Sequence, residues 1–196
     1  MSFRFFALIS RMKNISRWAL MRNSFPENVQ EHSHMVAVIA HGLAVIRRDV
    51  LGVPCDPDRA AAAALFHDAS EIYTGDMPTP VKYFNPEIMT AYKQVESLAA
   101  DKLLSTLPDG MRPAYRELLD ESDEDIRRLV KAADKLSAYI KCLEELKSGS
   151  TEFSLAARQT EARLRDMHMP EVDYFMEHFI PAFDLTLDEL NEHREP

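Results

Sequence analysis

Residues 60–71, Ala60-Ala-Ala-Ala-Ala-Leu-Phe-His-Asp-Ala-Ser-Glu71, carry the most distinctive pattern of this chain. It is an almost unbroken apolar run that ends in two adjacent ionisable residues, His67 and Asp68, with Glu71 one turn later. Burying such a pair behind alanine and leucine is costly unless a partner compensates for it. A divalent metal ion is a suitable partner, because a neutral imidazole and a carboxylate are both good ligands for it. Taken alone, the His-Asp pair favours a simpler interpretation, a helix end at which both side chains meet water.

Two segments far from this stretch favour the metal interpretation. Upstream, His32 lies on the apolar stripe of a helical pattern. Downstream, Asp134 lies one turn after Val130, on the buried stripe of an otherwise amphipathic pattern. An ion pair of Asp134 with Lys131 or Lys135 is the alternative, but its place in the stripe argues against that pairing. Three predicted helices therefore direct four side chains toward one point: His32, His67, Asp68 and Asp134.

This order of His, His-Asp and Asp resembles the HD-domain phosphohydrolases. The likeness extends to five further segments: Arg17-Trp18 with Met21-Arg22, Glu27-Asn-Val-Gln-Glu-His-Ser33, His67-Asp-Ala-Ser-Glu71, Thr74-Gly-Asp-Met-Pro-Thr-Pro-Val-Lys82 and Tyr139-Ile-Lys-Cys-Leu-Glu-Glu-Leu146. Together they resemble the bacterial 5'-deoxynucleotidases of the YfbR type over nearly the whole chain. A lone His-Asp pair is weak support for such a likeness, whereas this ordered set is strong.

The resemblance implies an all-α fold, a single-domain helical bundle of the HD type over residues 1–196. It implies a metal site built from His32, His67, Asp68 and Asp134, with Co²⁺ or Mn²⁺ as the ion. Members with two metal ions use extra histidines in an interval where this chain, between Asp68 and Asp134, has none, so one ion is expected. The implied reaction is hydrolysis of a deoxyribonucleoside 5'-monophosphate to deoxyribonucleoside and phosphate, and a homodimer is implied as well.

Three side chains are the catalytic candidates: Glu71, Asp68 and Arg17. Glu71 follows His67 by four residues and so is expected on the same helix face. It is either a surface acid or a proton-transfer group beside a polarised water, and we favour the second role. Arg17 is always charged, and its planar fork matches a phosphate. Asp68 is expected to share the proton transfer as well as to bind the metal.

The substrate contacts are implied by the resemblance. Trp18, the single tryptophan, reads as a core residue on composition alone, but the resemblance places it beside the phosphate and sugar. The segment after the His-Asp stretch contains glycine and prolines, so it is expected to form a rim over the pocket. The full set of implied contacts is Arg17, Trp18, Asp68, Asp76, Met77, Pro78, Thr79 and Asp134.

Composition and charge exclude several other classes. Hydrophobic residues make up 46% of the 196, and only five residues are glycine, as expected for a helical globular protein. A net charge of −9 argues against binding to a nucleic acid polymer. No apolar run approaches the roughly 20 residues that cross a membrane. Cys55 and Cys142 form no CxxC motif, which predicts free thiols in the cytoplasm.

Residues 1–26 carry five basic side chains and no acid. Such a start is typical of a mitochondrial transit peptide or of a structural first helix whose basic end faces an anionic ligand. We favour the second interpretation, because a cleaved leader would discard Arg17 and Trp18. His34 and His41 are expected to be packed, or to support a ligand by a hydrogen bond, rather than to bind the metal.

The periodicity predicts helices, joined by loops, over most of the chain. The first four cover residues 3–13, 28–49, 56–72 and 85–106, and the third of these is expected to be the central helix. A short helix follows Pro113, and the next is capped by Ser122 and Asp125 and runs to Lys147. Helices over 151–167 and 171–183 and a last turn capped by Thr186 and Glu189 complete the chain.

The competing functions on this scaffold are a phosphodiesterase, a (p)ppGpp-type pyrophosphohydrolase and a non-catalytic nucleotide sensor.

Overall fold

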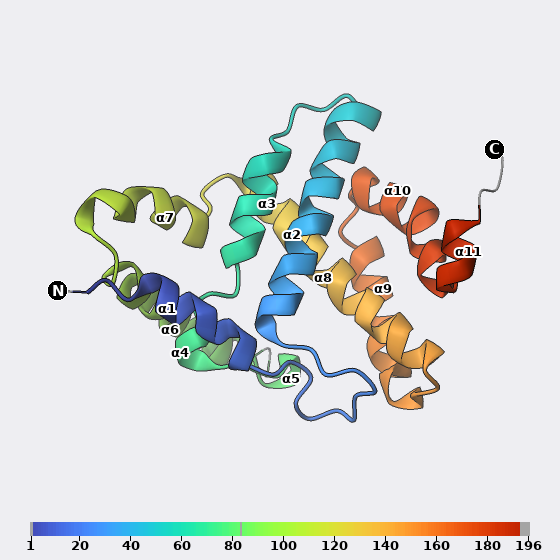
Figure 1. Cartoon of the computed structure of the whole chain (residues 1–196), viewed down its shortest axis with the longest axis horizontal. Helices are drawn as coiled ribbons and strands as arrows, with labels where there is room; N and C mark the ends of the chain where they lie inside the picture. Colours follow the sequence, from blue (N-terminus) through green and yellow to red (C-terminus); the bar gives the residue numbers. More distant parts are fainter. Residues whose placement is uncertain (1, 83, 193–196) are drawn as a thin grey trace.

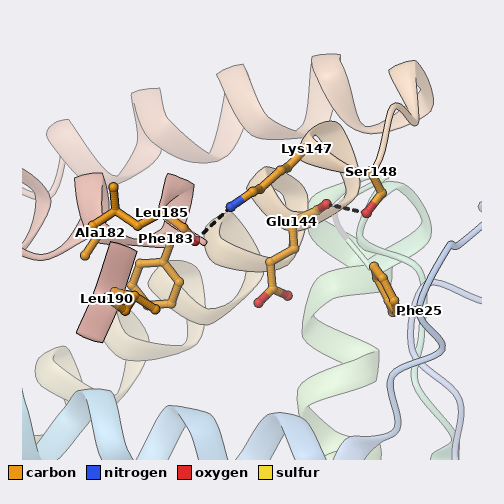
Figure 2. A pocket seen from close by; sticks show the side chains of 8 residues that line it. All are labelled: Phe25, Glu144, Lys147, Ser148, Ala182, Phe183, Leu185 and Leu190. Carbon is orange, nitrogen blue, oxygen red and sulfur yellow. Dashed lines mark hydrogen bonds between the residues drawn. The ribbon is translucent and has the colours of Figure 1, made fainter. Parts of the chain in front are cut away.

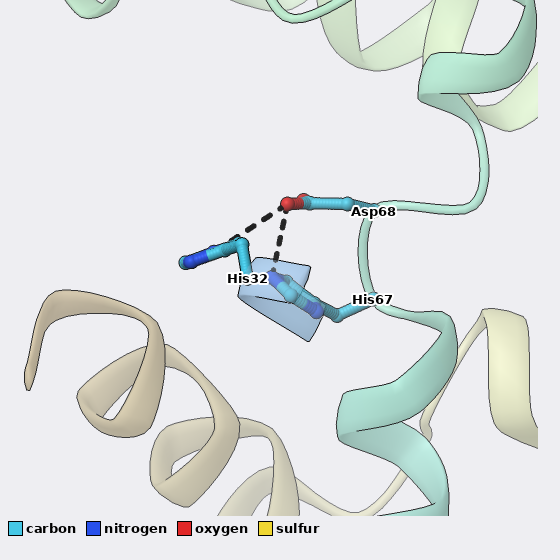
Figure 3. A group of neighbouring side chains, drawn as sticks. All are labelled: His32, His67 and Asp68. Atoms are coloured by element: carbon cyan, nitrogen blue, oxygen red, sulfur yellow. Dashed lines mark ion pairs between the residues drawn. The ribbon is translucent and has the colours of Figure 1, made fainter. Parts of the chain in front are cut away.

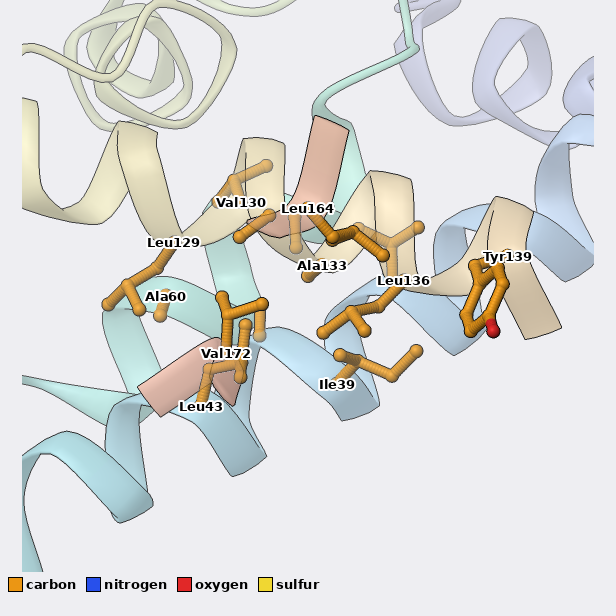
Figure 4. Packing of buried hydrophobic residues seen from close by; sticks show 14 of the residues in the cluster. Ile39, Leu43, Ala60, Leu129, Val130, Ala133, Leu136, Tyr139, Leu164 and Val172 are labelled. Atoms are coloured by element: carbon orange, nitrogen blue, oxygen red, sulfur yellow. The ribbon is translucent and has the colours of Figure 1, made fainter. Parts of the chain in front are cut away.

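Three helices pack against one another and form the main core: α2 (Val29–Val45), α3 (Pro57–Phe66) and α8 (Glu124–Lys147). They are seen together in Figure 1, a computed structural model that describes residues 2–82 and 84–192. Figure 4 shows how Leu43 of α2, Ala60 of α3 and Leu129 of α8 approach in this core. The alanines of α3 have almost no side-chain bulk, so the neighbouring helices lie close to its backbone.

The remaining elements surround these three helices. They are α1 (Phe5–Ile9), η1 (Ser10–Asn14), a π-helical turn η2 (Ile46–Val50), α4 (Glu71–Thr74), α5 (Thr79–Lys82), α6 (Pro86–Leu104), η3 (Asp109–Met111), α7 (Arg112–Leu119), η4 (Thr151–Phe153), α9 (Ser154–Arg165), α10 (Pro170–His178), η5 (Ile180–Asp184) and α11 (Leu187–Asn191). The β pairing in the described residues is limited to one isolated bridge, between Ser16 and Asn28. The all-α prediction is confirmed.

A second, smaller core joins the start of the chain to the segment after α3. Phe5 of α1 is 1% exposed and packs with Ala69, which follows the His-Asp pair, and with Leu103 of α6. Figure 1 shows α1 lying beside α4 and α6. Phe5 therefore joins the basic first segment to the packed structure.

Several helix ends form as their sequence predicts. Asn28 and Glu31 make a reciprocal capping box at the start of α2, and Thr186 and Glu189 make another at α11. The predicted cap of α8 is wrong by one residue. Asp123, not Ser122 or Asp125, accepts the first free N–H groups of the helix. An aspartate at this position satisfies two donors with one oxygen, which explains the shift.

The alanine-rich helix differs from its prediction in two ways. It ends at Phe66 instead of continuing to Ile72, and α2, which contacts both α3 and α8 as well as α10 and η1, takes the central place. Leu65 near its end is 45% exposed, so the helix is not enclosed on all sides. Within the described residues, no helix combines the length and the apolar character that crossing a membrane requires.

Candidate active site

His67 and Asp68 lie in a turn directly after α3. The imidazole Nδ1 of His67 makes a 2.7 Å hydrogen bond to the carbonyl oxygen of Ala64, in the last turn of the helix. The backbone then continues with i→i−3 bonds, from Ala69 to Phe66 and from Glu71 to Asp68. In a regular helix, adjacent side chains point about 100° apart. In this turn, His67 and Asp68 both lie near His32, at the start of α2 (Figure 3).

Four side chains converge at this turn. Nε2 of His32 lies 3.1 Å from Oδ1 of Asp134 and 3.7 Å from Oδ2 of Asp68. Nε2 of His67 lies 3.1 Å from the same Asp68 oxygen. The ligand atoms of His32, His67 and Asp68 are all within 4.8 Å of one another, and Asp134 joins the group through its contact with His32. The structure thus brings together the residues that the sequence predicts to meet.

Both imidazoles are held in the orientation that a metal ligand needs. Nδ1 of His67 donates to a carbonyl oxygen, so Nε2 of its neutral form carries the free lone pair. Nδ1 of His32 is hydrogen-bonded to Oγ of Ser137 at 3.1 Å, which likewise leaves Nε2 toward the carboxylates. Nε2 of His67 is buried and faces Oδ2 of Asp68 at 3.1 Å. Two imidazole nitrogens and two carboxylates that meet at one buried point fit a borderline divalent ion.

The electrostatics of the group favour positive charge at its centre. Burial alone would lower the pKa of His67, but the carboxylates of Asp68 and Asp134 outweigh it and raise that pKa to about 9. Burial would conversely raise the pKa of Asp134, yet its hydrogen bond to His32 and the nearby cations hold it well below its usual range. The same field that retains protons on histidine attracts a metal cation.

Arg17 faces this cluster from the loop between η1 and α2. Its side chain is 12% exposed, and Nη1 lies 3.5 Å from Oδ2 of Asp68. Burial lowers the pKa of the guanidinium, but Asp134, Asp68 and Glu27 together raise it above its usual value. Arg17 is therefore a permanent cation beside the predicted ligands, where a phosphate would need one.

Trp18 follows in the left-handed backbone region, with φ of 57°. Its ring packs on Phe153, at 5.4 Å between centroids. Its indole N–H donates to Oε2 of Glu27 at 3.0 Å, and Nε of Arg17 donates to that same oxygen at 3.0 Å. Sequence reasoning assigned no role to Glu27. The available signal was its position as the first acidic residue of the chain, directly after the basic segment.

Glu71 is the first residue of α4 and is buried. The expectation that it shares a helix face with His67 is wrong, because the turn at residues 67–70 interrupts the helix. Burial and repulsion from Asp68 and Asp76 nevertheless raise the pKa of Glu71 to about 9, and its Oε2 has no hydrogen-bond partner. A buried acid with a raised pKa next to a cation site is suited to proton transfer.

The predicted rim follows Gly75, whose φ of 71° favours glycine. Asp76 and Met77 are half-buried and Pro78 is exposed. Burial raises the pKa of Asp76 while Arg17 opposes the rise, so Asp76 faces the same electrostatic centre. The backbone of Thr79 begins α5, but its side chain lies outside the described part of the structure.

Two other histidines of α2 lie outside this cluster. His34 and His41 are exposed, so the expectation that they are packed or support a ligand is wrong. The buried face of α2 is occupied by its apolar residues and His32.

A pocket of about 730 Å³ opens between the end of α8 and the η5–α11 segment (Figure 2). Among its described lining residues, Phe25, Glu144, Lys147, Ser148, Ala182, Phe183, Leu185 and Leu190, there is no predicted site residue.

Comparison with known proteins gives consistent matches. The family model described as 5'-deoxynucleotidase YfbR-like matches residues 4–183. A 5'-deoxynucleotidase from Pectobacterium atrosepticum is 50% identical, over 96% of each chain, and the 5'-deoxynucleotidase YfbR of Escherichia coli is 50% identical over the same shares.

Two solved structures extend the comparison to three dimensions. An HD-domain phosphohydrolase from Listeria innocua superposes with a TM-score of 0.80, at 27% identity over 92% of this chain and 88% of that one. The cyanophage S-2L HD phosphohydrolase DatZ, bound to dA and one catalytic Zn²⁺ ion, superposes with a TM-score of 0.63, at 25% identity over 89% of this chain and 95% of that one.

Proposed function

The chain belongs to the YfbR-like family of 5'-deoxynucleotidases, and we propose that its His-Asp cluster is the metal centre of this activity. In this proposal His32, His67, Asp68 and Asp134 hold one divalent ion. The substrate is a deoxyribonucleoside 5'-monophosphate, and the products are the deoxyribonucleoside and inorganic phosphate. The unit that carries the activity is one HD-type domain over residues 1–196.

One observation carries the assignment of the metal centre. Nδ1 of His67 donates to a carbonyl oxygen, so in the neutral ring the lone pair of the buried Nε2 faces Oδ2 of Asp68 at 3.1 Å. A lone pair and a carboxylate repel each other at this distance unless a proton or a metal cation lies between them. His32 presents its Nε2 to the same Asp68 oxygen. The two imidazoles therefore share the environment of a single ion.

When bound, the ion supplies Lewis acidity, which lowers the pKa of a nearby water toward neutrality and draws charge from a phosphate oxygen. The chain's own residues do the rest. Arg17 offsets the charge that builds on the phosphoryl oxygens. Glu71 accepts a proton from the attacking water or returns one to the leaving 5'-oxygen, and Asp68 shares this proton transfer. Asp134 would bind the ion as a ligand, and its negative charge also attracts Arg17.

Preference for deoxyribonucleotides would come from the walls of the sugar site. Trp18 is fixed by its hydrogen bond to Glu27 and by its contact with Phe153. The segment Asp76, Met77, Pro78 and Thr79 would form the opposite wall, with Asp76 and Thr79 as hydrogen-bonding candidates for the sugar. An indole held beside the sugar would exclude a 2'-hydroxyl by steric contact, because the restrained ring could not move away from it.

The ion, the assembly and the compartment are further parts of the proposal. Co²⁺ or Mn²⁺ suits a nitrogen-oxygen site, although such sites accept several first-row ions, and DatZ holds Zn²⁺. A homodimer would cover apolar side chains that α2 and α3 expose, Val38 and Leu65 among them. Free thiols at Cys55 and Cys142 are consistent with the cytoplasm. Light scattering at several protein concentrations tests the dimer.

The activity is tested by phosphate release from dAMP and AMP, each with Co²⁺ or Mn²⁺ added to metal-free protein. We expect release from dAMP and much slower release from AMP. Equal rates would contradict the deoxy preference, and no release from either would contradict the enzyme. Adding 3',5'-cyclic AMP and a nucleoside triphosphate separates this activity from a phosphodiesterase or pyrophosphohydrolase. Tight dAMP binding without phosphate release would instead indicate a nucleotide sensor.

A further inference from the structure

We propose that Glu27 is a positioning residue that sets the side chains of Arg17 and Trp18 for the phosphate and sugar of the substrate. The inference rests on the proposed function of those two residues. It assigns Glu27 no contact with the reacting atoms. Its carboxylate acts through Arg17, whose Nη1 lies 3.5 Å from Oδ2 of Asp68, and through Trp18, which bonds to the same Glu27 oxygen as Arg17.

A single oxygen of Glu27 holds both side chains. Oε2 accepts a hydrogen bond from Nε of Arg17 and another from Nε1 of Trp18, each 3.0 Å long. The backbone repeats the connection, because the N–H of Arg17 donates to the carbonyl oxygen of Glu27 at 2.9 Å. Because Nε donates to Glu27, the terminal Nη groups are the ones left to face the cluster, and Nη1 lies 3.5 Å from Oδ2 of Asp68. These N–H groups can donate hydrogen bonds to a phosphate.

Trp18 needs such a restraint. A non-glycine residue at φ of 57° lies in the left-handed region and is strained there. Two backbone-directed bonds support the turn, from the N–H of Met21 and from Nδ2 of Asn23 to the carbonyl oxygen of Trp18. The indole ring itself is held by its hydrogen bond to Glu27 and by its contact with Phe153. Strain of this kind persists where a specific side-chain position is useful.

The rest of the loop is anchored independently of Glu27. Glu145 of α8 is fully buried and accepts the backbone N–H groups of Ser24 and Phe25. Lys141, one turn earlier on α8, donates to Glu145 and to the carbonyl oxygen of Phe25. Because the loop stays attached to α8 without Glu27, removing the carboxylate releases Arg17 and Trp18 rather than unfolding the segment.

The test uses Glu27→Ala and Glu27→Gln in the full chain, with three measurements. The first is KM and kcat for dAMP, and the second is the content of bound metal. The third is acrylamide quenching of fluorescence, which reports on this loop alone because Trp18 is the single tryptophan. The matched control is Glu161→Gln, which removes the same charge from an exposed pair with Arg165.

For Glu27→Ala we expect KM to rise at least about tenfold, the effect of losing one charge-assisted hydrogen bond. Metal content should stay at the wild-type level, and Trp18 should become more accessible to acrylamide. Glu27→Gln keeps an oxygen in the same place, so it should restore most of both properties. The control should match wild type throughout.

Unchanged KM and quenching in Glu27→Ala would overturn the inference, as would a loss of metal that accounts for the rise in KM. If circular dichroism shows that Glu27→Ala does not fold, Glu27→Asp decides instead. Its shorter carboxylate cannot keep both 3.0 Å contacts, so wild-type KM and quenching would overturn the inference there too. A wild-type protein that releases no phosphate would contradict the proposed function. The quenching comparison would still show whether Glu27 restrains the indole of Trp18.

Discussion

The two sides of the candidate site are built in different ways. On the metal side, His32 and Asp134 project from α2 and α8, and His67 and Asp68 follow α3 directly; these helices form the main core. On the substrate side, Arg17 and Trp18 lie on a loop with no regular structure, and Asp76 lies on the rim after Gly75. The first arrangement depends on helix packing, whereas the second depends on a small number of polar contacts.

This difference has consequences for mutation. A substitution on the metal side removes one of the four proposed ligands, which α2, α8 and the turn after α3 carry. A substitution on the substrate side leaves the metal centre in place and alters binding or proton transfer. We therefore expect metal content to fall in variants of the metal side and to stay at the wild-type level in variants of the substrate side.

His67→Ala should have the largest effect. It removes one of the two imidazole nitrogens that face Asp68, so the ion should be lost and with it measurable phosphate release. His34→Ala is the matched control, because His34 is an exposed histidine of α2. Metal analysis and phosphate release are measured on both proteins. Full metal content in His67→Ala would show that the ion binds elsewhere and would remove the distinction between the two sides.

Glu71→Gln should leave the metal in place and lower kcat by about 10²–10⁴-fold, the range for loss of a general acid–base group. Glutamine has nearly the same shape but cannot exchange a proton. If Glu71 transfers a proton, its titration should appear in the kcat–pH profile of the wild type and be absent from that of the variant. A kcat within a few-fold of wild type would assign Glu71 a structural role only.

The direction of a site residue can be predicted from the sequence where it lies on a helix whose apolar residues recur at helical spacing. The apolar stripe of α2 places His32 inward, and the stripe of α8 brings Asp134 to the same centre, so the directions of these two predicted ligands follow from spacing. The end of α3 could not be predicted in this way. It depends on the imidazole of His67 bonding to the Ala64 carbonyl oxygen, a local contact that apolar periodicity does not encode.

The substrate side was less predictable for the same physical reason. Glu27 bonds to side chains nine and ten residues earlier, and Glu145 bonds to backbone groups more than a hundred residues away. Contacts of this kind have no period in the sequence. Likeness to known proteins pointed to Arg17 and Trp18, but only the structure identifies which residues hold them.

Ser137→Ala should have an intermediate effect, a loss of metal affinity of about 10–100-fold. The serine hydroxyl fixes Nδ1 of His32 at 3.1 Å, so without it the ring is free to rotate away from the ion. Ser148→Ala, at the exposed end of α8, is the control. Metal affinity is measured by titration with a competing chelator. Wild-type affinity in Ser137→Ala would mean that packing alone orients His32.

Glu145→Gln should have the smallest effect on turnover and a clear effect on stability. Removing one partner of a buried ion pair costs about 3–5 kcal/mol of unfolding free energy, because Lys141 remains buried without its counter-charge. Metal content of the folded variant should equal that of wild type, since the pair contacts the loop and no predicted ligand. Urea midpoints at pH 7 measure the loss, and Glu161→Gln again serves as the control.

The pH dependence of this stability has a defined sign. Burial would raise the pKa of Glu145, but the hydrogen bonds from Lys141, Ser24 and Phe25 lower it from 4.5 to about 2. A lowered carboxyl pKa contributes stability that is fully present above pH 4.5 and is lost as the pH falls toward 2. The gap in unfolding free energy between wild type and Glu145→Gln should therefore narrow over that interval. A gap of constant size would show that the carboxylate stabilises the loop by shape and not by charge, and the loop would then resemble the packed metal side more closely than we infer.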